Sequence, residues 1–103
     1  MLVHNKCPGG EFYRGGNDFT AIEGDYKLTS DGLVKSTHGV SVNTDPMAVS
    51  KFGTPHKIVD IPDGLKIIQR GLNPLHYERV PSSPMTIIEY QTLLSKIIAV
   101  PRL

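Results

Sequence analysis

The sequence predicts a small α+β domain in which short strands and turns dominate and a helix comes last. Ten glycines and eight prolines in 103 residues require many turns between short elements. Runs with strand-like patterns, such as Val40–Asn43 and Leu65–Gln69, recur along the chain. The clearest helical pattern is confined to residues 86–97. We therefore expect one sheet with short helices and a C-terminal helix.

The first third of the chain predicts an arm, a strand and a hairpin. Residues 1–10 are expected to form an N-terminal arm, and residues 11–103 a single domain, because no linker or repeat divides them. Glu11–Arg14 is a strand candidate that ends at two glycines, which weaken strands and permit tight turns. The pair Asp31-Gly32 is a hairpin signal. It lies between two further strand candidates: Tyr26–Thr29 and Leu33–Ser36.

The middle of the chain predicts a strand, a brief helix and then more strands. Val40–Asn43 alternates like a strand with one buried face. Asp45 suits a helix N-cap and Pro46 the first turn, whereas Gly53 and Pro55 end the helix after a few residues. Three strand candidates follow, each next to turn residues: His56–Ile61, Leu65–Gln69 and His76–Val80.

The last predicted element is the C-terminal helix. Thr86 and Glu89 have the spacing of a capping box, in which each side chain satisfies a backbone N–H of the other. Apolar residues then recur at helical spacing: Ile87, Tyr90, Leu94 and Ile97.

Composition limits the classes of partner. A hydrophobic content of 39% and a charged content of 20% fit one globular domain with a modest core. The net charge of +1 argues against strong nucleic-acid binding, which needs clustered lysine and arginine. No apolar run approaches the roughly 20 residues that cross a bilayer, so no membrane partner is expected. The N-terminus lacks the basic-then-apolar pattern of a cleavable signal peptide.

Cysteine and histidine usage argues against a metal site. The single cysteine, Cys7, cannot form an internal disulfide, which favours a reducing compartment. His4, His38 and His56 show no metal-ligand spacing with one another or with Cys7. We therefore expect no metal.

Arg14 and Ser41 are candidates for ligand binding. Arg14 precedes two glycines, where a backbone can approach a ligand closely and a guanidinium can bind phosphate. Ser41 alternates with Val40 and Val42, so its side chain points away from theirs. A solvated arginine at a strand end and a serine on a solvent-facing side explain the same pattern.

His76 and Glu78 are candidates for proton transfer or sugar binding. They are two residues apart on a predicted strand, so both side chains project from the same face. The alternative is that each makes one cross-strand hydrogen bond and nothing more.

The order and spacing of several short motifs resemble one family of bacterial toxins. The motifs are Phe12-Tyr13-Arg14-Gly15, Val40-Ser41-Val42, the run from Asp60 to Lys66, His76-Tyr77, Val80-Pro81 and Pro84-Met85. Over roughly residues 11–95 they are similar to the ADP-ribosyltransferase-like toxins delivered by type VI secretion systems, whose relatives end large polymorphic toxins. The resemblance implies a split antiparallel sheet with small helices that opens a cleft for NAD.

The resemblance assigns NAD binding to the first two strands. Tyr13, Arg14 and Gly15 match the family's first strand, whose arginine holds NAD. Ser41 matches the second-strand serine that shapes the nicotinamide pocket. NAD is then a substrate, and no metal is implied.

The resemblance assigns catalysis to His76, Glu78 and Ser41. His76 matches the family's functional histidine, and Glu78 falls where ADP-ribosyltransferases place the glutamate that steadies the ribose. The residue two before the usual glutamate is His76 instead of Glu or Gln, which argues against transfer to protein arginine.

The resemblance implies a transferase-like toxin domain of bacterial competition. Such an effector consumes NAD in the cytoplasm of the target cell, by ADP-ribosyl transfer or by NAD hydrolysis, and reaches it without a cleavable signal peptide. It implies one protein partner, a small acidic immunity protein that covers the cleft near Arg14 and His76. The acceptor of ADP-ribose stays open and could be protein, nucleic acid or water. Two alternatives remain open: a ribonuclease toxin that uses His76 and Arg14, and a binding module without enzymatic activity.

Overall fold

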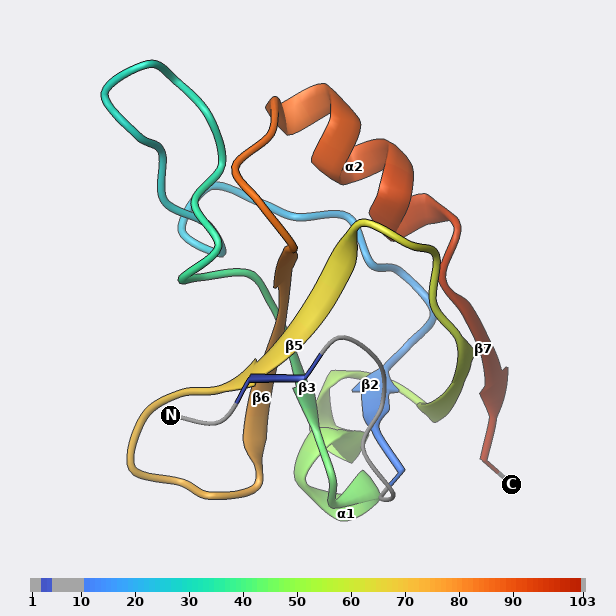
Figure 1. Ribbon diagram of the computed structural model, residues 1–103. Helices are drawn as coiled ribbons and strands as arrows, with labels where there is room; N and C mark the ends of the chain where they lie inside the picture. The colour runs from blue at the N-terminus through green and yellow to red at the C-terminus, as the bar shows by residue number, and fades with distance from the viewer. Residues whose placement is uncertain (1–2, 5–10, 103) are drawn as a thin grey trace.

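The computed structural model describes residues 3–4 and 11–102, which form an α+β domain (Figure 1). The elements in chain order are β1 Val3–His4, β2 Tyr13–Gly15, β3 Val40–Asn43, α1 Pro46–Val49, the 3-10 helix Ser50–Phe52, β4 Pro55–Asp60, β5 Leu65–Gln69, β6 His76–Pro81, α2 Ile87–Ser95 and β7 Ile98–Pro101. Helix α2 lies at one end of the strands and α1 at the other (Figure 1). None of the helices in these two ranges is long and apolar enough to cross a membrane.

The strands form one antiparallel sheet that is weakly joined in its middle. The order is β1-β5-β6-β3-β2-β4-β7. Strands β3 and β6 pair from Val40–Arg79 through Asn43–His76, and β2 pairs with β4 along its whole length. By contrast, β2 and β3 are joined at the single pair Tyr13–Asn43. The sheet therefore opens between β2 and β3.

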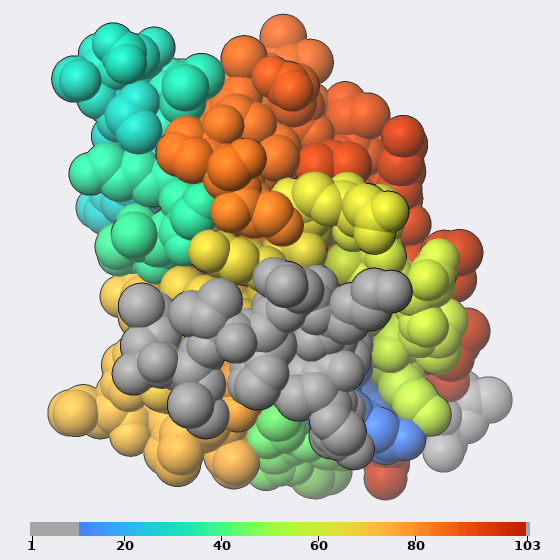
Figure 2. Space-filling view, viewed as in Figure 1, coloured from blue at the N-terminus to red at the C-terminus, as the bar shows by residue number. Residues whose placement is uncertain are grey.

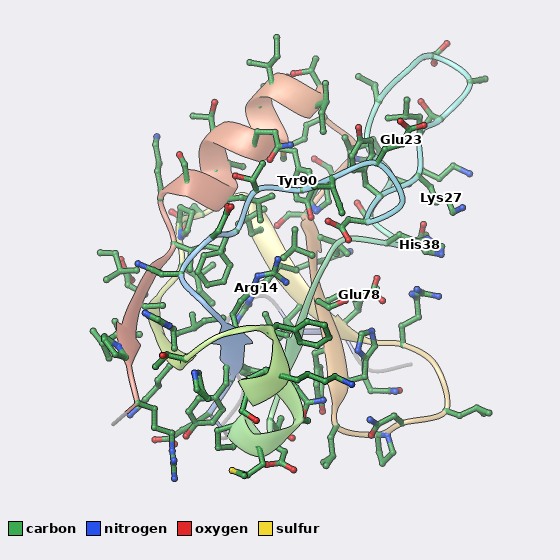
Figure 3. All side chains as sticks on the ribbon, turned by 180° about the vertical axis from the view of Figure 1, so that it is seen from behind. Arg14, Glu23, Lys27, His38, Glu78 and Tyr90 are labelled. Carbon is green, nitrogen blue, oxygen red and sulfur yellow. The ribbon has the colours of Figure 1, made fainter. Side chains whose placement is uncertain are left out.

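The core lies where α2 packs against the sheet. Val40, Val42 and Ile67 are fully buried on the strands, and Leu94 of α2 packs with them. Tyr90 of α2 also reaches the sheet, because its hydroxyl donates to Arg79 O (2.6 Å) and accepts the N–H of Val40 (3.1 Å) (Figure 3). Helix α2 is thus fixed by both apolar packing and a buried hydroxyl.

Tyr90→Phe should lower the free energy of unfolding by about 2 kcal/mol, because the buried N–H of Val40 loses its acceptor. Urea unfolding of the wild type and variant measures the difference. Tyr26→Phe is the matched control, since Tyr26 packs against the same core and is partly exposed. An equal loss in both variants would contradict this role for Tyr90.

Local signals in the sequence correctly place the turns and caps. The predicted hairpin turn forms, with Gly32 at φ 81° and its N–H bonded to Thr29 O (3.0 Å). Its two predicted strands shorten to the single bridge Leu28–Val34. This hairpin projects beside α2 at one end of the molecule (Figure 2). Asp45 caps α1 through the N–H of Met47 (2.9 Å), and the predicted capping box is present at the start of α2.

The predicted C-terminal helix is not the last element. Helix α2 ends at Ser95, and Ile98–Pro101 continues as β7, which pairs with β4 at the edge of the sheet. Ile97, predicted on the helix face, lies after the helix and is still buried in the core. Within the predicted arm, Val3–His4 pairs with β5 as β1, and Cys7 lies outside the described residues.

Candidate functional site

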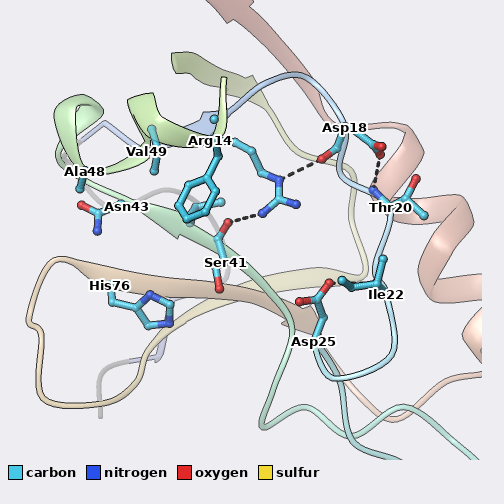
Figure 4. A pocket seen from close by; sticks show the side chains of 13 residues that line it. Arg14, Asp18, Thr20, Ile22, Asp25, Ser41, Asn43, Ala48, Val49 and His76 are labelled. Carbon is cyan, nitrogen blue, oxygen red and sulfur yellow. Dashed lines mark hydrogen bonds between the residues drawn. The ribbon is translucent and has the colours of Figure 1, made fainter. Parts of the chain in front are cut away.

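A pocket of about 570 Å³ lies where the sheet opens between β2 and β3 (Figure 4). Strand β2 contributes Arg14 and Gly15, and β3 contributes Ser41. His76 approaches from the start of β6. The loop after β2 and the segment from α1 to Phe52 complete the wall. Four of the six residues predicted for the site, Arg14, Gly15, Ser41 and His76, therefore border one cavity.

Arg14 spans the opening between the two strands. Its Nε donates to Asp18 O (2.9 Å) and its Nη1 to Ser41 O (2.8 Å), so the side chain links β2 to β3 and to the following loop (Figure 4). Burial lowers the pKa of Arg14, and the nearby carboxylates of Asp25 and Asp18 oppose that shift. A guanidinium has five N–H groups and stays protonated in proteins. Its remaining N–H groups can serve an anionic ligand in the pocket.

Ser41 faces the pocket because of the strand alternation that the sequence predicts. Val40 and Val42 are buried, whereas Ser41 is exposed. Its carbonyl accepts from Arg14 and its hydroxyl remains on the cavity side (Figure 4). A serine hydroxyl both donates and accepts hydrogen bonds, so it suits an amide or a sugar hydroxyl of a ligand.

His76 and Glu78 form a hydrogen-bonded pair at the pocket edge. Their backbones lie opposite Asn43 and Ser41 of β3, and His76 Nε2 lies 2.9 Å from Glu78 Oε2. Because an ionised carboxylate only accepts, the imidazole Nε2–H is the donor. Nδ1 is then the ring atom that can take up a proton. The predicted proximity of the two side chains is confirmed, and Glu78 orients His76.

Glu78 itself is buried behind the pocket. Its side chain is 3% exposed and does not line the cavity. Oε1 accepts the N–H of Gly39 (3.0 Å), and Oε2 accepts Arg70 Nε (3.0 Å) as well as His76. Burial raises the pKa of Glu78, but the hydrogen bonds from Arg70, His76 and Gly39 outweigh it and the net pKa is lowered. Glu78 is thus held ionised, with both oxygens occupied.

Gly15 permits the close packing that forms one pocket wall. A Cβ at this position would lie 2.3 Å from Val49 O and 2.8 Å from Phe52 Cβ. Only a residue without a side chain lets the segment from α1 to Phe52 pack this closely over β2. The sequence singled out this glycine for ligand approach, and the structure gives it a packing role at the pocket.

Tyr13 lies outside the pocket. Consecutive side chains of a strand point to opposite faces, so Tyr13 is directed away from Arg14. Its hydroxyl donates to Glu11, whose carboxylate also pairs with Lys57 (2.8 Å). The hydrogen bond to Glu11 raises the pKa of Tyr13, and Lys57, followed by Tyr13, lowers the pKa of Glu11. Tyr13 of β2 is thus linked through Glu11 to Lys57 of the neighbouring strand β4.

The loop after β2 brings further residues to the pocket that the sequence did not single out. Asp18, Ile22 and Asp25 line the cavity beside Arg14, and Phe52 lines it from the 3-10 helix. No sequence motif marks these residues. The loop is held at the pocket by contacts with residues distant in the sequence, since Gln91 of α2 exchanges two hydrogen bonds with the backbone of Ala21 (2.9 and 2.6 Å). Gly24-Asp25 indicates a turn in the sequence, but it does not indicate a binding site.

Among the described residues, no group of three or more histidine, cysteine, aspartate or glutamate side chains is placed to hold a metal ion. Comparisons with protein-family models, with curated proteins and with solved structures give no match.

Proposed function

We propose that the chain is a toxin domain that binds NAD in the pocket between β2 and β3 and cleaves it in an ADP-ribosyltransferase-like reaction. The observation that carries the proposal is the opening of the sheet at the single Tyr13–Asn43 pair, with Arg14 reaching across it. An ADP-ribosyltransferase-like fold, with its split sheet, is part of this proposal.

The chemistry of the pocket suits the parts of a dinucleotide. Arg14 keeps N–H groups for the pyrophosphate, and charge-assisted bonds from a guanidinium are among the strongest in proteins. Ser41 offers a hydroxyl to the same cavity from the neighbouring strand β3. A volume of about 570 Å³ is within the range of small-molecule and cofactor sites.

The proposed mechanism uses His76 as a general base. Cleavage of the bond between nicotinamide and ribose leaves an oxocarbenium-like centre, which an acceptor oxygen or nitrogen then attacks. His76 would take the acceptor's proton on Nδ1, while Glu78 holds the ring through Nε2. Glu78 therefore acts through His76 in this proposal and does not contact the ribose. The acceptor can be a macromolecule or water.

We also propose an acidic immunity protein as the partner that covers the pocket mouth. Ile22 and Phe52 border the cavity, yet they are 68% and 70% exposed. Exposed apolar side chains gathered at the rim of a cavity are typical of an interaction surface. The type VI effector setting, with action in the target cell cytoplasm, belongs to the same proposal and rests on the sequence resemblance.

Arg14→Ala should weaken NAD binding roughly tenfold to a hundredfold, because it removes a charge-assisted contact made before the reaction begins. Titration calorimetry with NAD measures the dissociation constant. Arg14→Lys is the control, since it keeps the charge but cannot bind the Asp18 and Ser41 carbonyls in the same fork. Unchanged affinity in a folded Arg14→Ala protein would contradict phosphate binding by Arg14.

A second candidate function is RNA cleavage by the same residues. The observation that favours it is that a histidine held by a carboxylate borders the same cavity as an arginine. Incubating the purified protein separately with NAD and with RNA distinguishes the two functions. Nicotinamide release with intact RNA supports the NAD-consuming toxin, and RNA degradation with intact NAD supports the nuclease. Loss of neither substrate supports the binding module.

A further inference from the structure

The predicted catalytic carboxylate does not border the pocket. Glu78 is 2% exposed, and its two oxygens accept hydrogen bonds from Gly39, Arg70 and His76. To reach a ligand in the cavity, the Glu78 side chain would have to break these hydrogen bonds. The same bonds lower the pKa of Glu78, so its carboxylate would lose the partners that keep it ionised. A buried charge stripped of its partners is strongly destabilising. The pocket therefore needs another anion if it is to stabilise positive charge on a substrate.

Asp25 is a carboxylate that borders the pocket itself. It belongs to the loop after β2 and is half-buried. In Figure 4 its carboxylate points into the cavity, toward the Ser41 side. Asp25 also lies close enough to Arg14 to oppose the lowering of that guanidinium's pKa. A cation and an anion thus line the same cavity from β2 and from the loop that follows it.

The turn around Asp25 holds its carboxylate in place. The N–H of Asp25 donates to Ile22 O (2.9 Å), and Oδ2 accepts the N–H of Ile22 (2.8 Å). Gly24, at φ 103°, permits the turn. Oδ1 of Asp25 accepts no hydrogen bond from the described part of the chain. One oxygen fixes the side chain, and the other is available to a ligand.

We infer that Asp25, instead of Glu78, is the carboxylate that contacts the ribose of NAD and stabilises its oxocarbenium-like centre. The inference rests on the NAD-consuming function proposed above. The bond between C1′ and the pyridinium nitrogen breaks, and its electron pair leaves with neutral nicotinamide. With water as acceptor, its oxygen bonds to C1′ and its proton passes to His76. Asp25 forms no covalent bond and is not consumed, while the positive charge that develops on the ribose lies beside its carboxylate.

Asp25→Asn tests this assignment with little change of structure. The asparagine carbonyl can still accept the N–H of Ile22, so the turn is retained while the charge is lost. The purified variant should lower kcat for nicotinamide release at least about a hundredfold, with KM for NAD within about threefold of the wild type. Its thermal unfolding midpoint should match that of the wild type.

Glu23→Gln is the matched control, because Glu23 lies in the same turn, is exposed and does not line the pocket (Figure 3). Glu23→Gln removes one negative charge, as Asp25→Asn does, at a position two residues before Asp25. This variant should retain the wild-type kcat. A kcat for Asp25→Asn within threefold of an active wild type would overturn the role of Asp25 and leave the proposed function standing. Equal losses in Asp25→Asn and Glu23→Gln would also overturn it, since net charge would then be responsible. A wild type that releases no nicotinamide would reject the proposed function and this inference together.

Discussion

Glu78→Gln is expected to lower both the stability of the fold and the turnover of NAD. A glutamine side chain has one acceptor oxygen and one NH2 group, whereas the Glu78 carboxylate accepts hydrogen bonds at both oxygens. The NH2 group would therefore face donors, either Arg70 and His76 or the N–H of Gly39. Breaking a fully buried charge pair costs about 3–5 kcal/mol, and the 43% exposure of Arg70 reduces this to about 2–3 kcal/mol. Turnover should fall about a hundredfold, because His76 loses the group that orients it. Urea unfolding and nicotinamide release measure the two effects.

The stability difference should depend on pH in one direction. In spite of burial, the hydrogen bonds from Arg70, His76 and Gly39 hold the pKa of Glu78 in the folded protein below the ordinary value of a glutamate carboxyl. Its contribution is therefore complete above the unfolded-state pKa and is lost as the pH falls through the folded-state pKa. The gap in unfolding free energy between wild type and Glu78→Gln should thus be widest at neutral pH and should narrow as the pH falls below the ordinary glutamate pKa of about 4.3. A gap that stays constant with pH, or one equal to that of the exposed Glu23→Gln control, would contradict the buried ion-pair role.

Gly15→Ala is expected to destabilise the protein by about 2–3 kcal/mol and to impair NAD binding. The added Cβ would lie 2.3 Å from Val49 O, so the backbone of α1 must move away from β2. Val49 and Phe52 line the pocket, and the same movement therefore changes its shape. Unfolding free energies and NAD dissociation constants test both effects.

Gly32→Ala is the matched control for this steric argument. Gly32 has a φ of 81°, and no atom lies within 4 Å of the position that a Cβ would take. The alanine should therefore lower the free energy of unfolding by about 1 kcal/mol through backbone strain alone, at a site distant from the pocket. Gly15 has no such backbone constraint. Gly32→Ala should bind NAD like the wild type, and equally unchanged binding by Gly15→Ala would show that Gly15 does not shape the pocket.

Much of the fold could be predicted because its signals are local. Val40–Asn43 and Leu65–Gln69 have the predicted strand bounds, and the caps at Asp45 and Thr86 depend on neighbours within a few residues. Strand β7 was missed because Ile97 continues the helical spacing of the preceding residues. Its strand conformation depends on pairing with β4, far away in the sequence.

The candidate site could be predicted in part. Strand alternation correctly turns Ser41 away from the core, and two-residue spacing correctly brings His76 and Glu78 together. The same spacing does not show which of the two is exposed, because Arg70 and the Gly39 N–H that bury Glu78 come from other segments. Asp25 could not be identified, since a loop without a sequence motif carries it to the pocket.

The most direct test of the proposed NAD site is a crystal structure of the domain with bound NAD. The Asp25→Asn protein is suited to this, because it should bind NAD while cleaving it slowly. The account predicts a dinucleotide between β2 and β3, with its pyrophosphate within hydrogen-bonding distance of the Arg14 guanidinium and its nicotinamide ribose facing residue 25. A dinucleotide bound elsewhere, or a pocket that stays empty at saturating NAD, would contradict it.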